Sequence, residues 1–197
     1  MPRPDVSEER RPQIIQAALR LFSRQGYRKT TMPDVAREAG LSVGGIYWYY
    51  QSKEALVLAI AGQIFQGDLA LLRSLLHQDA PVTERLRAYA AQTGPQAAEL
   101  RWLTVTGIQF YAEAQHDEKI RAFIQQYLAQ YRTVLAELIA QGVARGEFRP
   151  VDPLYTANLF LILVEGLGLL ESAGLDQADW ATTFQLGMEL LLAGLSV

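Results

Sequence analysis

Apolar residues recur along most of the chain at the three- and four-residue spacing of amphipathic α-helices. In the first such stretch, about residues 9–25, Ile14, Ala18, Leu21 and Phe22 share one face. Alternating runs of β-branched residues are missing, whereas Ala, Leu, Gln, Glu and Arg dominate. We therefore expect an all-α protein of about nine helices.

Helix start and stop signals divide the chain further. Thr31 can cap a second helix, with Asp34 at the N3 position of a capping box, and Gly40 ends it. Ser42 can cap a third helix, which runs to about Tyr49. The remaining helices are expected at about 52–76, 82–92, 96–115, 118–144, 153–172 and 177–193, with the break between the fifth and the sixth at Thr93–Pro95.

Composition narrows the class of protein. Of the 197 residues, 50% are hydrophobic and 20% are charged, as in a globular protein with a sizeable core. The absence of cysteine excludes disulfides and thiol chemistry. The apolar window Leu159–Leu170 is shorter than the ~20 residues that span a bilayer, and residues 1–13 contain no apolar signal segment. We expect a buried helix at this window, no membrane partner and a cytoplasmic location.

Charge is distributed unevenly along the chain. Residues 1–56 contain nine Lys/Arg against six Asp/Glu, and residues 57–197 contain nine against fifteen. A basic N-terminal part on an acidic remainder favours a polyanion as the partner of that part. We expect two domains, a small basic one at 1–51 and a larger helical one at 52–197.

The segment AGLS, at residues 39–42, joins two short helices as a DNA-binding helix-turn-helix requires. Ile46 and Tyr50 are four residues apart in the third helix, so they share a face that is expected to turn inward. Glycine in a helix costs about 1 kcal/mol relative to alanine, so a close approach of DNA to the backbone would explain its use here. The opposite, outward face is expected to carry Val43, Gly44, Tyr47 and Trp48, with Tyr49 at its edge.

The whole stretch from Ile14 to Leu56 resembles the DNA-binding domain of TetR/AcrR-type transcriptional repressors. It contains the A-x-x-L-F-x-x-x-G-Y helix, the T-T-x-x-D-V-A-x-x-A-G-x-S block and the I-Y-x-Y-Y-x-S-K-E-A-L end of that family. The rest of the chain matches the family only in length, helical character and helix count. The resemblance implies that residues 1–51 are the DNA-binding domain and that residues 52–197 are the helical domain for ligand binding and dimerisation. The resemblance implies a homodimeric transcriptional regulator, most often a repressor, that a small-molecule effector releases from a palindromic operator in double-stranded DNA.

The resemblance also implies roles for individual residues. Thr31 and Tyr47 correspond to phosphate contacts, and Lys53 to a lysine that pairs with the DNA backbone. Since the groove face offers few hydrogen-bonding groups, readout is expected to rely on thymine methyl groups, Tyr49 and DNA shape. The cap of the third helix and the groove-facing positions complete the DNA-binding set: Ser42, Val43, Gly44, Gly45, Trp48 and Tyr49.

Several of these roles have a plainer alternative. Tyr47 and Lys53 could belong to a solvated surface, and Trp48 could be partly buried. The arginines near the N-terminus could form a basic arm that reaches phosphate or the minor groove, or a solvated tail: Arg3, Arg10 and Arg11.

The larger domain contains candidates for a ligand pocket, which the resemblance implies among its middle helices. We select Trp102, Phe110, Tyr127 and Glu165, although plain core packing is the alternative for each aromatic residue. Glu165 lies in an apolar helix, where an unpaired carboxylate is costly. It is expected to meet a cationic or hydrogen-bonding ligand, or to pair with an arginine.

The last two helices are apolar over more than one face, whereas a surface helix has a polar half. We expect them to pair with their copies in a second subunit, and burial within one chain is the alternative.

An enzyme is the rival class of function. Glu113, His116 and Asp117 lie within one turn and could hold a metal, but a solvated helix end is the plainer interpretation. No phosphate loop, nucleophile elbow or dinucleotide motif is present. We expect no catalytic residue, metal or cofactor. A DNA binder without a regulatory role is a third class, against which the long acidic remainder argues.

Overall fold

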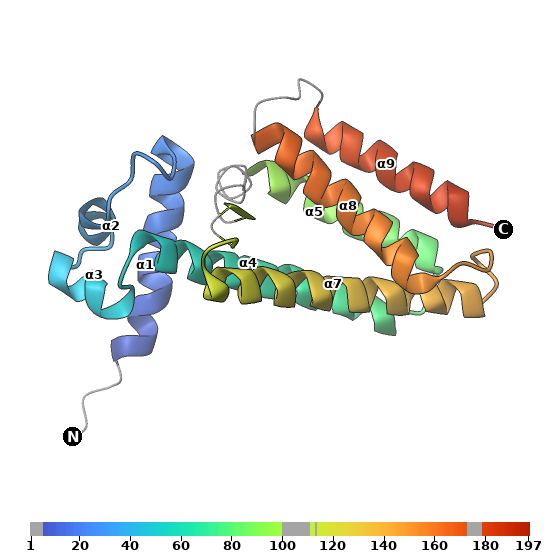
Figure 1. The fold of residues 1–197 in the computed structure, drawn as a ribbon, viewed down its shortest axis with the longest axis horizontal. Helices are drawn as coiled ribbons and strands as arrows, with labels where there is room; N and C mark the ends of the chain where they lie inside the picture. Colours follow the sequence, from blue (N-terminus) through green and yellow to red (C-terminus); the bar gives the residue numbers. More distant parts are fainter. Residues whose placement is uncertain (1–5, 100–110, 113, 173–178) are drawn as a thin grey trace. The chain divides into compact units, whose positions relative to one another are not determined.

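The computed structural model describes residues 6–99, 111–112, 114–172 and 179–197, most of them helical (Figure 1). Eight α-helices and one 3-10 helix lie in these ranges, where the only extended pairing is a β-bridge between Phe148 and Ser196. The all-α prediction is confirmed. The predicted sixth helix, at 96–115, falls mostly outside the described residues.

The chain divides into two compact units, residues 1–64 and 65–197. Helix α4 (Lys53–Ser74) contributes its first residues to one unit and its last residues to the other. The first unit also contains α1 (Val6–Gln25), α2 (Met32–Glu38) and α3 (Val43–Tyr49). The second unit also contains η1 (Leu75–His77), α5 (Val82–Glu99), α7 (Glu118–Ala144), α8 (Pro153–Ser172) and α9 (Trp180–Leu195).

Side-chain caps fix the starts of α2 and α3. Thr31 Oγ1 accepts the N–H of Asp34 at 3.3 Å, and the Asp34 carboxylate accepts the N–H of Thr31 at 3.0 Å, which forms the predicted capping box. Ser42 Oγ accepts the N–H of Gly45 at 3.0 Å and caps α3, also as predicted. Between the helices Gly40 has a φ of 64°, which glycine adopts without strain. The sharp turn between the two helices follows from this conformation.

Helix α5 is longer than predicted. It continues from Val82 to Glu99, so the break predicted at Thr93–Pro95 is wrong. A proline removes one backbone donor, but it does not end a helix whose neighbouring turns are held in place. Helix α5 packs against α7 and α9, and Thr93 Oγ1 donates to the Tyr89 carbonyl at 2.9 Å.

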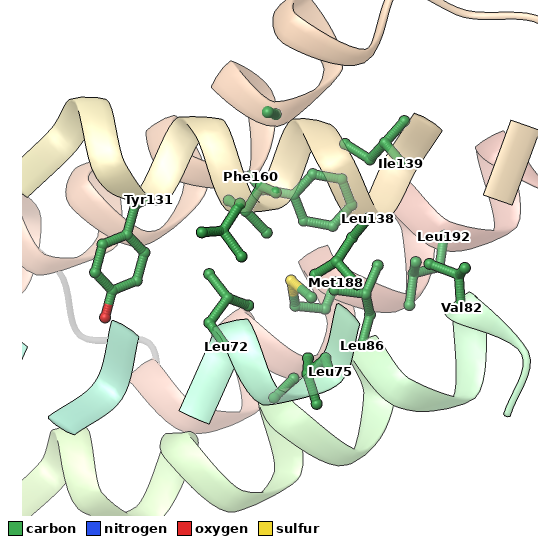
Figure 2. Packing of buried hydrophobic residues seen from close by; sticks show 14 of the residues in the cluster. Leu72, Leu75, Val82, Leu86, Tyr131, Leu138, Ile139, Phe160, Met188 and Leu192 are labelled. Carbon is green, nitrogen blue, oxygen red and sulfur yellow. The ribbon is translucent and has the colours of Figure 1, made fainter. Parts of the chain in front are cut away.

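The core of the second unit lies between the facing sides of its helices (Figure 2). Helix α7 packs along α8, and α9 packs on both α5 and α8. Each large aliphatic or aromatic side chain buried there stabilises the fold by about 1.5–3 kcal/mol. The labelled core side chains are Leu72, Leu75, Val82, Leu86, Tyr131, Leu138, Ile139, Phe160, Met188 and Leu192.

Helix α8 is buried on one side only, so the prediction of a buried helix at Leu159–Leu170 is wrong for the single chain. Ala157 and Phe160 lie in the core, whereas Ile162 is 65% exposed. By length and composition, two helices among the described residues could cross a membrane, 53–77 and 153–170. This is weak evidence, because core helices of soluble proteins pass the same test. The single chain therefore leaves one side of α8 exposed to solvent.

Candidate functional site: a helix-turn-helix face and a second, helical unit

The outward face of α3 is exposed in the way that the sequence predicts. Trp48 is 71% exposed, Val43 45% and Tyr47 44%, while Ile46 and Tyr50 are buried. The alternative in which Trp48 is partly buried is wrong. A tryptophan and a tyrosine side by side on the surface of one short helix indicate a contact surface, since such rings are ordinarily half covered or more.

The surroundings of the two glycines in α3 explain one of them and not the other. A Cβ on Gly45 would lie 3.1 Å from Ser42 Oγ, so Gly45 leaves room for the helix cap. A Cβ on Gly44 would meet nothing within 4 Å. Packing within the chain therefore does not explain Gly44, although alanine would favour the helix by up to about 1 kcal/mol.

The hydroxyl groups near α3 differ in whether they already donate a hydrogen bond within the protein. Ser42 Oγ accepts the cap hydrogen bond, and a hydroxyl that accepts can still donate its proton. Thr31 Oγ1 donates its proton to Asp34 Oδ2 at 2.6 Å, so a phosphate would have to compete with this carboxylate. Tyr47 is exposed and lies five residues after the cap residue Ser42.

Lys53 ties the start of α4 to the turn between α1 and α2. Its Nζ donates to the carbonyls of Tyr27 and Thr30, both at 3.0 Å, and lies 4.1 Å from the centre of the Tyr27 ring. An ammonium has three N–H donors, so one remains for another acceptor. Lys53 thus holds the start of α4 to the preceding turn and keeps one N–H group for another acceptor.

The N-terminal arginines belong partly to α1. Arg10 donates to Gln13 at 2.8 Å, and Arg11 places its guanidinium carbon 5.5 Å from the centre of the Tyr50 ring and 5.9 Å from that of Tyr49. Arg10 and Arg11 therefore form neither a free arm nor a solvated tail, whereas Arg3 lies outside the described residues.

The second unit contains a polar cluster that joins three helices. Asp68 of α4 accepts the hydroxyl of Tyr89 from α5 at 2.8 Å and that of Tyr131 from α7. Tyr127, also on α7, stacks on Phe65 with ring centres 4.0 Å apart. The cluster places hydroxyl groups, aromatic rings and a carboxylate in one region of this unit.

Glu165 of α8 belongs to the same region. Its carboxylate accepts the hydroxyl of Tyr111 at 2.5 Å. Burial raises the pKa of Glu165 and that of Asp68, and the hydrogen bonds from the tyrosines lower them in part. Burial raises the pKa of Tyr127 far above its usual value, and the charges of Glu165 and Asp68 add to this effect. Within the described residues, no arginine or lysine forms an ion pair with either carboxylate.

Exposed apolar side chains form a stripe along one face of α8, and α9, which packs on α8, exposes two more. The members on α8 are spaced by three to seven residues, as expected for one face of a helix. On α9, Leu190 is 66% exposed. We call the following residues the apolar stripe: Tyr155, Leu159, Ile162, Leu169, Leu186 and Leu190.

Two family models match the chain. The model for bacterial regulatory proteins of the tetR family matches residues 14–60, and the model for the C-terminal part of BetI-type transcriptional repressors matches residues 82–191. A relative from Bacillus subtilis (strain 168), the uncharacterised HTH-type transcriptional regulator YfiR, is 30% identical over 81% of this chain and 78% of its own length.

The chain belongs to the TetR family of bacterial transcriptional regulators.

Further relatives of this TetR-family chain are similar to it in sequence or in fold. The regulator BetI of Rhizobium meliloti (strain 1021) is 28% identical over 79% of this chain and 80% of its own length. A regulator from Saccharomonospora viridis solved in complex with choline has a TM-score of 0.80 at 23% identity, covering 97% of this chain and 100% of that one. The repressor FadR of Thermus thermophilus in complex with lauroyl-CoA has a TM-score of 0.66 at 25% identity, covering 95% of both chains.

The structure of this TetR-family protein brings some of the predicted residues together. Tyr127 and Glu165 share the polar cluster, whereas Trp102 and Phe110 lie outside the described residues. Asp68 was not predicted, although a single acidic residue in the apolar stretch IFQGDLALL is a signal that could have found it.

The metal site considered above, at Glu113, His116 and Asp117, is not supported by the described part of the chain. Within it no three His, Cys, Asp or Glu side chains gather as metal ligands would. Asp117 caps α7 through the N–H groups of Lys119 and Ile120, and Glu113 lies outside the described residues.

Proposed function

We propose that the protein is a cytoplasmic, homodimeric repressor that lays α3 of each subunit in the major groove of one half-site of a palindromic operator. The observation that carries this proposal is the face of α3 with an exposed Trp48 and an open backbone at Gly44. A recognition helix needs such a surface to reach base edges. Relatives that are named transcriptional repressors support the regulatory role.

The contacts divide into phosphate positioning and base readout. The hydroxyls of Tyr47 and Ser42 and the third N–H of Lys53 are suited to phosphates, and Thr31 would join them by releasing Asp34. The groove face itself consists of Val43, Gly44, Gly45, Trp48 and Tyr49. Its apolar groups suit thymine methyl groups, and the Tyr49 hydroxyl is its main polar reader.

Gly44→Ala is expected to affect stability and DNA binding in opposite directions. The added methyl group meets nothing in the free protein and favours the helix, so the free energy of unfolding should rise by about 0.5–1 kcal/mol. The same methyl group would hold the backbone away from the DNA, and operator affinity should fall about tenfold. Urea unfolding and fluorescence anisotropy with a labelled operator duplex measure the two effects.

Gly67→Ala is the matched control for this test. A methyl group added at Gly67 would also meet nothing within 4 Å, but Gly67 lies on the exposed side of α4 in the second unit. The substitution should stabilise the fold similarly and leave DNA affinity unchanged. An unchanged affinity in Gly44→Ala as well would show that α3 does not approach DNA through this glycine.

We propose further that the effector is a small organic cation bound at the polar cluster. Asp68 and Glu165 are two largely buried carboxylates whose described partners are neutral hydroxyl groups, so a positive charge would stabilise their ionised forms. Aromatic rings at the same place suit the apolar substituents of an ammonium group. An anionic acyl-CoA would be repelled by both carboxylates. Binding would act on the DNA-binding unit through α4, which carries Asp68 and has residues in both units.

Operator release by choline and by its neutral isostere 3,3-dimethylbutan-1-ol separates charge from shape. The protein is bound to a labelled duplex taken from the DNA that flanks its coding region, and each compound is titrated. Choline is expected to release the duplex, the isostere is not, and Asp68→Asn should weaken the response to choline at least tenfold with basal DNA affinity unchanged. Equal release by both compounds, or by neither, would contradict a cationic effector of this size.

A further inference from the structure

The exposed indole of Trp48 is connected to the core by one ring contact and by a guanidinium that lies over two rings. Its ring meets that of Tyr49 edge to face, with centres 4.7 Å apart and an interplanar angle of 84°. The Arg11 guanidinium from α1 lies near the rings of both Tyr49 and Tyr50. Tyr50 is buried, so Arg11 links the partly exposed Tyr49 to a ring that the core holds in place.

An exposed side chain with two rotatable bonds ordinarily samples several rotamers. It loses that freedom when it docks against a partner, and the loss weakens binding unless the side chain is already fixed. Trp48 is the most exposed of the large side chains on α3, so its orientation depends on Tyr49, with which it makes its one described ring contact. Whatever fixes Tyr49 therefore also restricts Trp48.

We propose that Arg11 is a positioning residue for Trp48. A guanidinium within about 6 Å of a ring centre is attracted to the ring face, and here one guanidinium meets this condition for two neighbouring rings. Arg11 thereby holds Tyr49 against α1, and Tyr49 holds the indole in the orientation that it presents to the groove. This inference extends the proposed function, on which only its affinity measurement rests.

Fluorine NMR of the full-length protein tests the placement of the ring without DNA. The tryptophans are labelled with 5-fluorotryptophan, and the Trp48 signal is assigned by its loss in Trp48→Phe. Arg11→Gln is expected to move and narrow the Trp48 signal and to leave that of Trp180 unchanged. Arg10→Gln is the matched control, because it removes the same charge from the neighbouring residue, which bonds to Gln13 and not to these rings.

The salt dependence of operator binding separates positioning from a direct phosphate contact. If Arg11 positions Trp48, Arg11→Gln weakens operator binding by about two- to tenfold while the slope of log affinity against log salt concentration stays the same. A slope that falls by about one per subunit would assign Arg11 to a phosphate and overturn the proposal. An unchanged Trp48 signal in Arg11→Gln would overturn it as well. If the wild-type protein binds no operator, the proposed function fails, while the fluorine spectrum still decides the placement of the ring.

Discussion

Val43→Glu is expected to weaken operator binding by about a hundredfold or more while the protein folds normally. Val43 is the first residue of α3 and is half exposed, so glutamate can replace it without filling any core space. A carboxylate in the first turn of a helix is also favourable because of the helix dipole. The defect should therefore be confined to DNA binding.

The physical reason is the charge of the partner. Double-stranded DNA has one negative charge per ~1.7 Å of its axis, and a carboxylate held against the groove meets this charge in both subunits. Like charges brought together in an interface cost several kcal/mol, and about 1.4 kcal/mol corresponds to a factor of ten in affinity. A hundredfold loss of operator affinity is therefore at the low end of what this repulsion would cause.

Val43→Gln is the matched control, because glutamine has the shape of glutamate without its charge. It should retain binding to within about tenfold of the wild type in the same anisotropy titration. Circular dichroism of both variants should be that of the wild type. Equal operator affinity for Val43→Glu and the wild type would mean that α3 does not face DNA.

Ile162→Glu is expected to convert a dimer into a monomer at micromolar concentration. Ile162 lies in the middle of the apolar stripe on α8, and the stripe leaves several large side chains uncovered in the single chain. Monomeric proteins seldom expose so many large apolar side chains on neighbouring helices, and a two-fold interface of α8 and α9 would cover them with their own copies. The substitution would then bury two unpaired carboxylates, one from each subunit.

Each buried carboxylate costs about 2 kcal/mol or more, so the dissociation constant should rise by about a thousandfold. Sedimentation velocity measures the change, and operator affinity should fall with it because two half-sites are no longer bound together. Ala140→Glu is the control, since Ala140 is exposed on α7 and lies outside the apolar stripe. A wild-type protein that sediments as a monomer at the same concentration would refute the dimer.

The helix-turn-helix could be predicted from sequence because its determinants are local. The capping box of Thr31 and Asp34, the cap at Ser42 and the turn at Gly40 each involve residues at most three apart. The inward side of α3 follows equally from a spacing of four residues, as the burial of Ile46 confirms.

The polar cluster could not be predicted in the same way because it is assembled over long distances in sequence. Asp68 meets Tyr89 and Tyr131, which are 21 and 63 residues away, and no local pattern relates them. Lys53 likewise reaches back to carbonyls 26 and 23 residues earlier, so its structural role is visible only in the folded chain. The error at Pro95 has another origin, since the packing of α5 against α7 and α9 outweighs a local helix breaker.

Selection of bound duplexes from a random-sequence DNA library tests the central claim most directly, namely that paired α3 helices recognise an operator. The purified protein is expected to enrich one palindrome, with half-sites centred about one helical turn or a multiple of it apart. Val43→Glu, carried through the same rounds, is expected to enrich nothing. Recovery of no common sequence by the wild type, or of the same palindrome by Val43→Glu, would contradict the account.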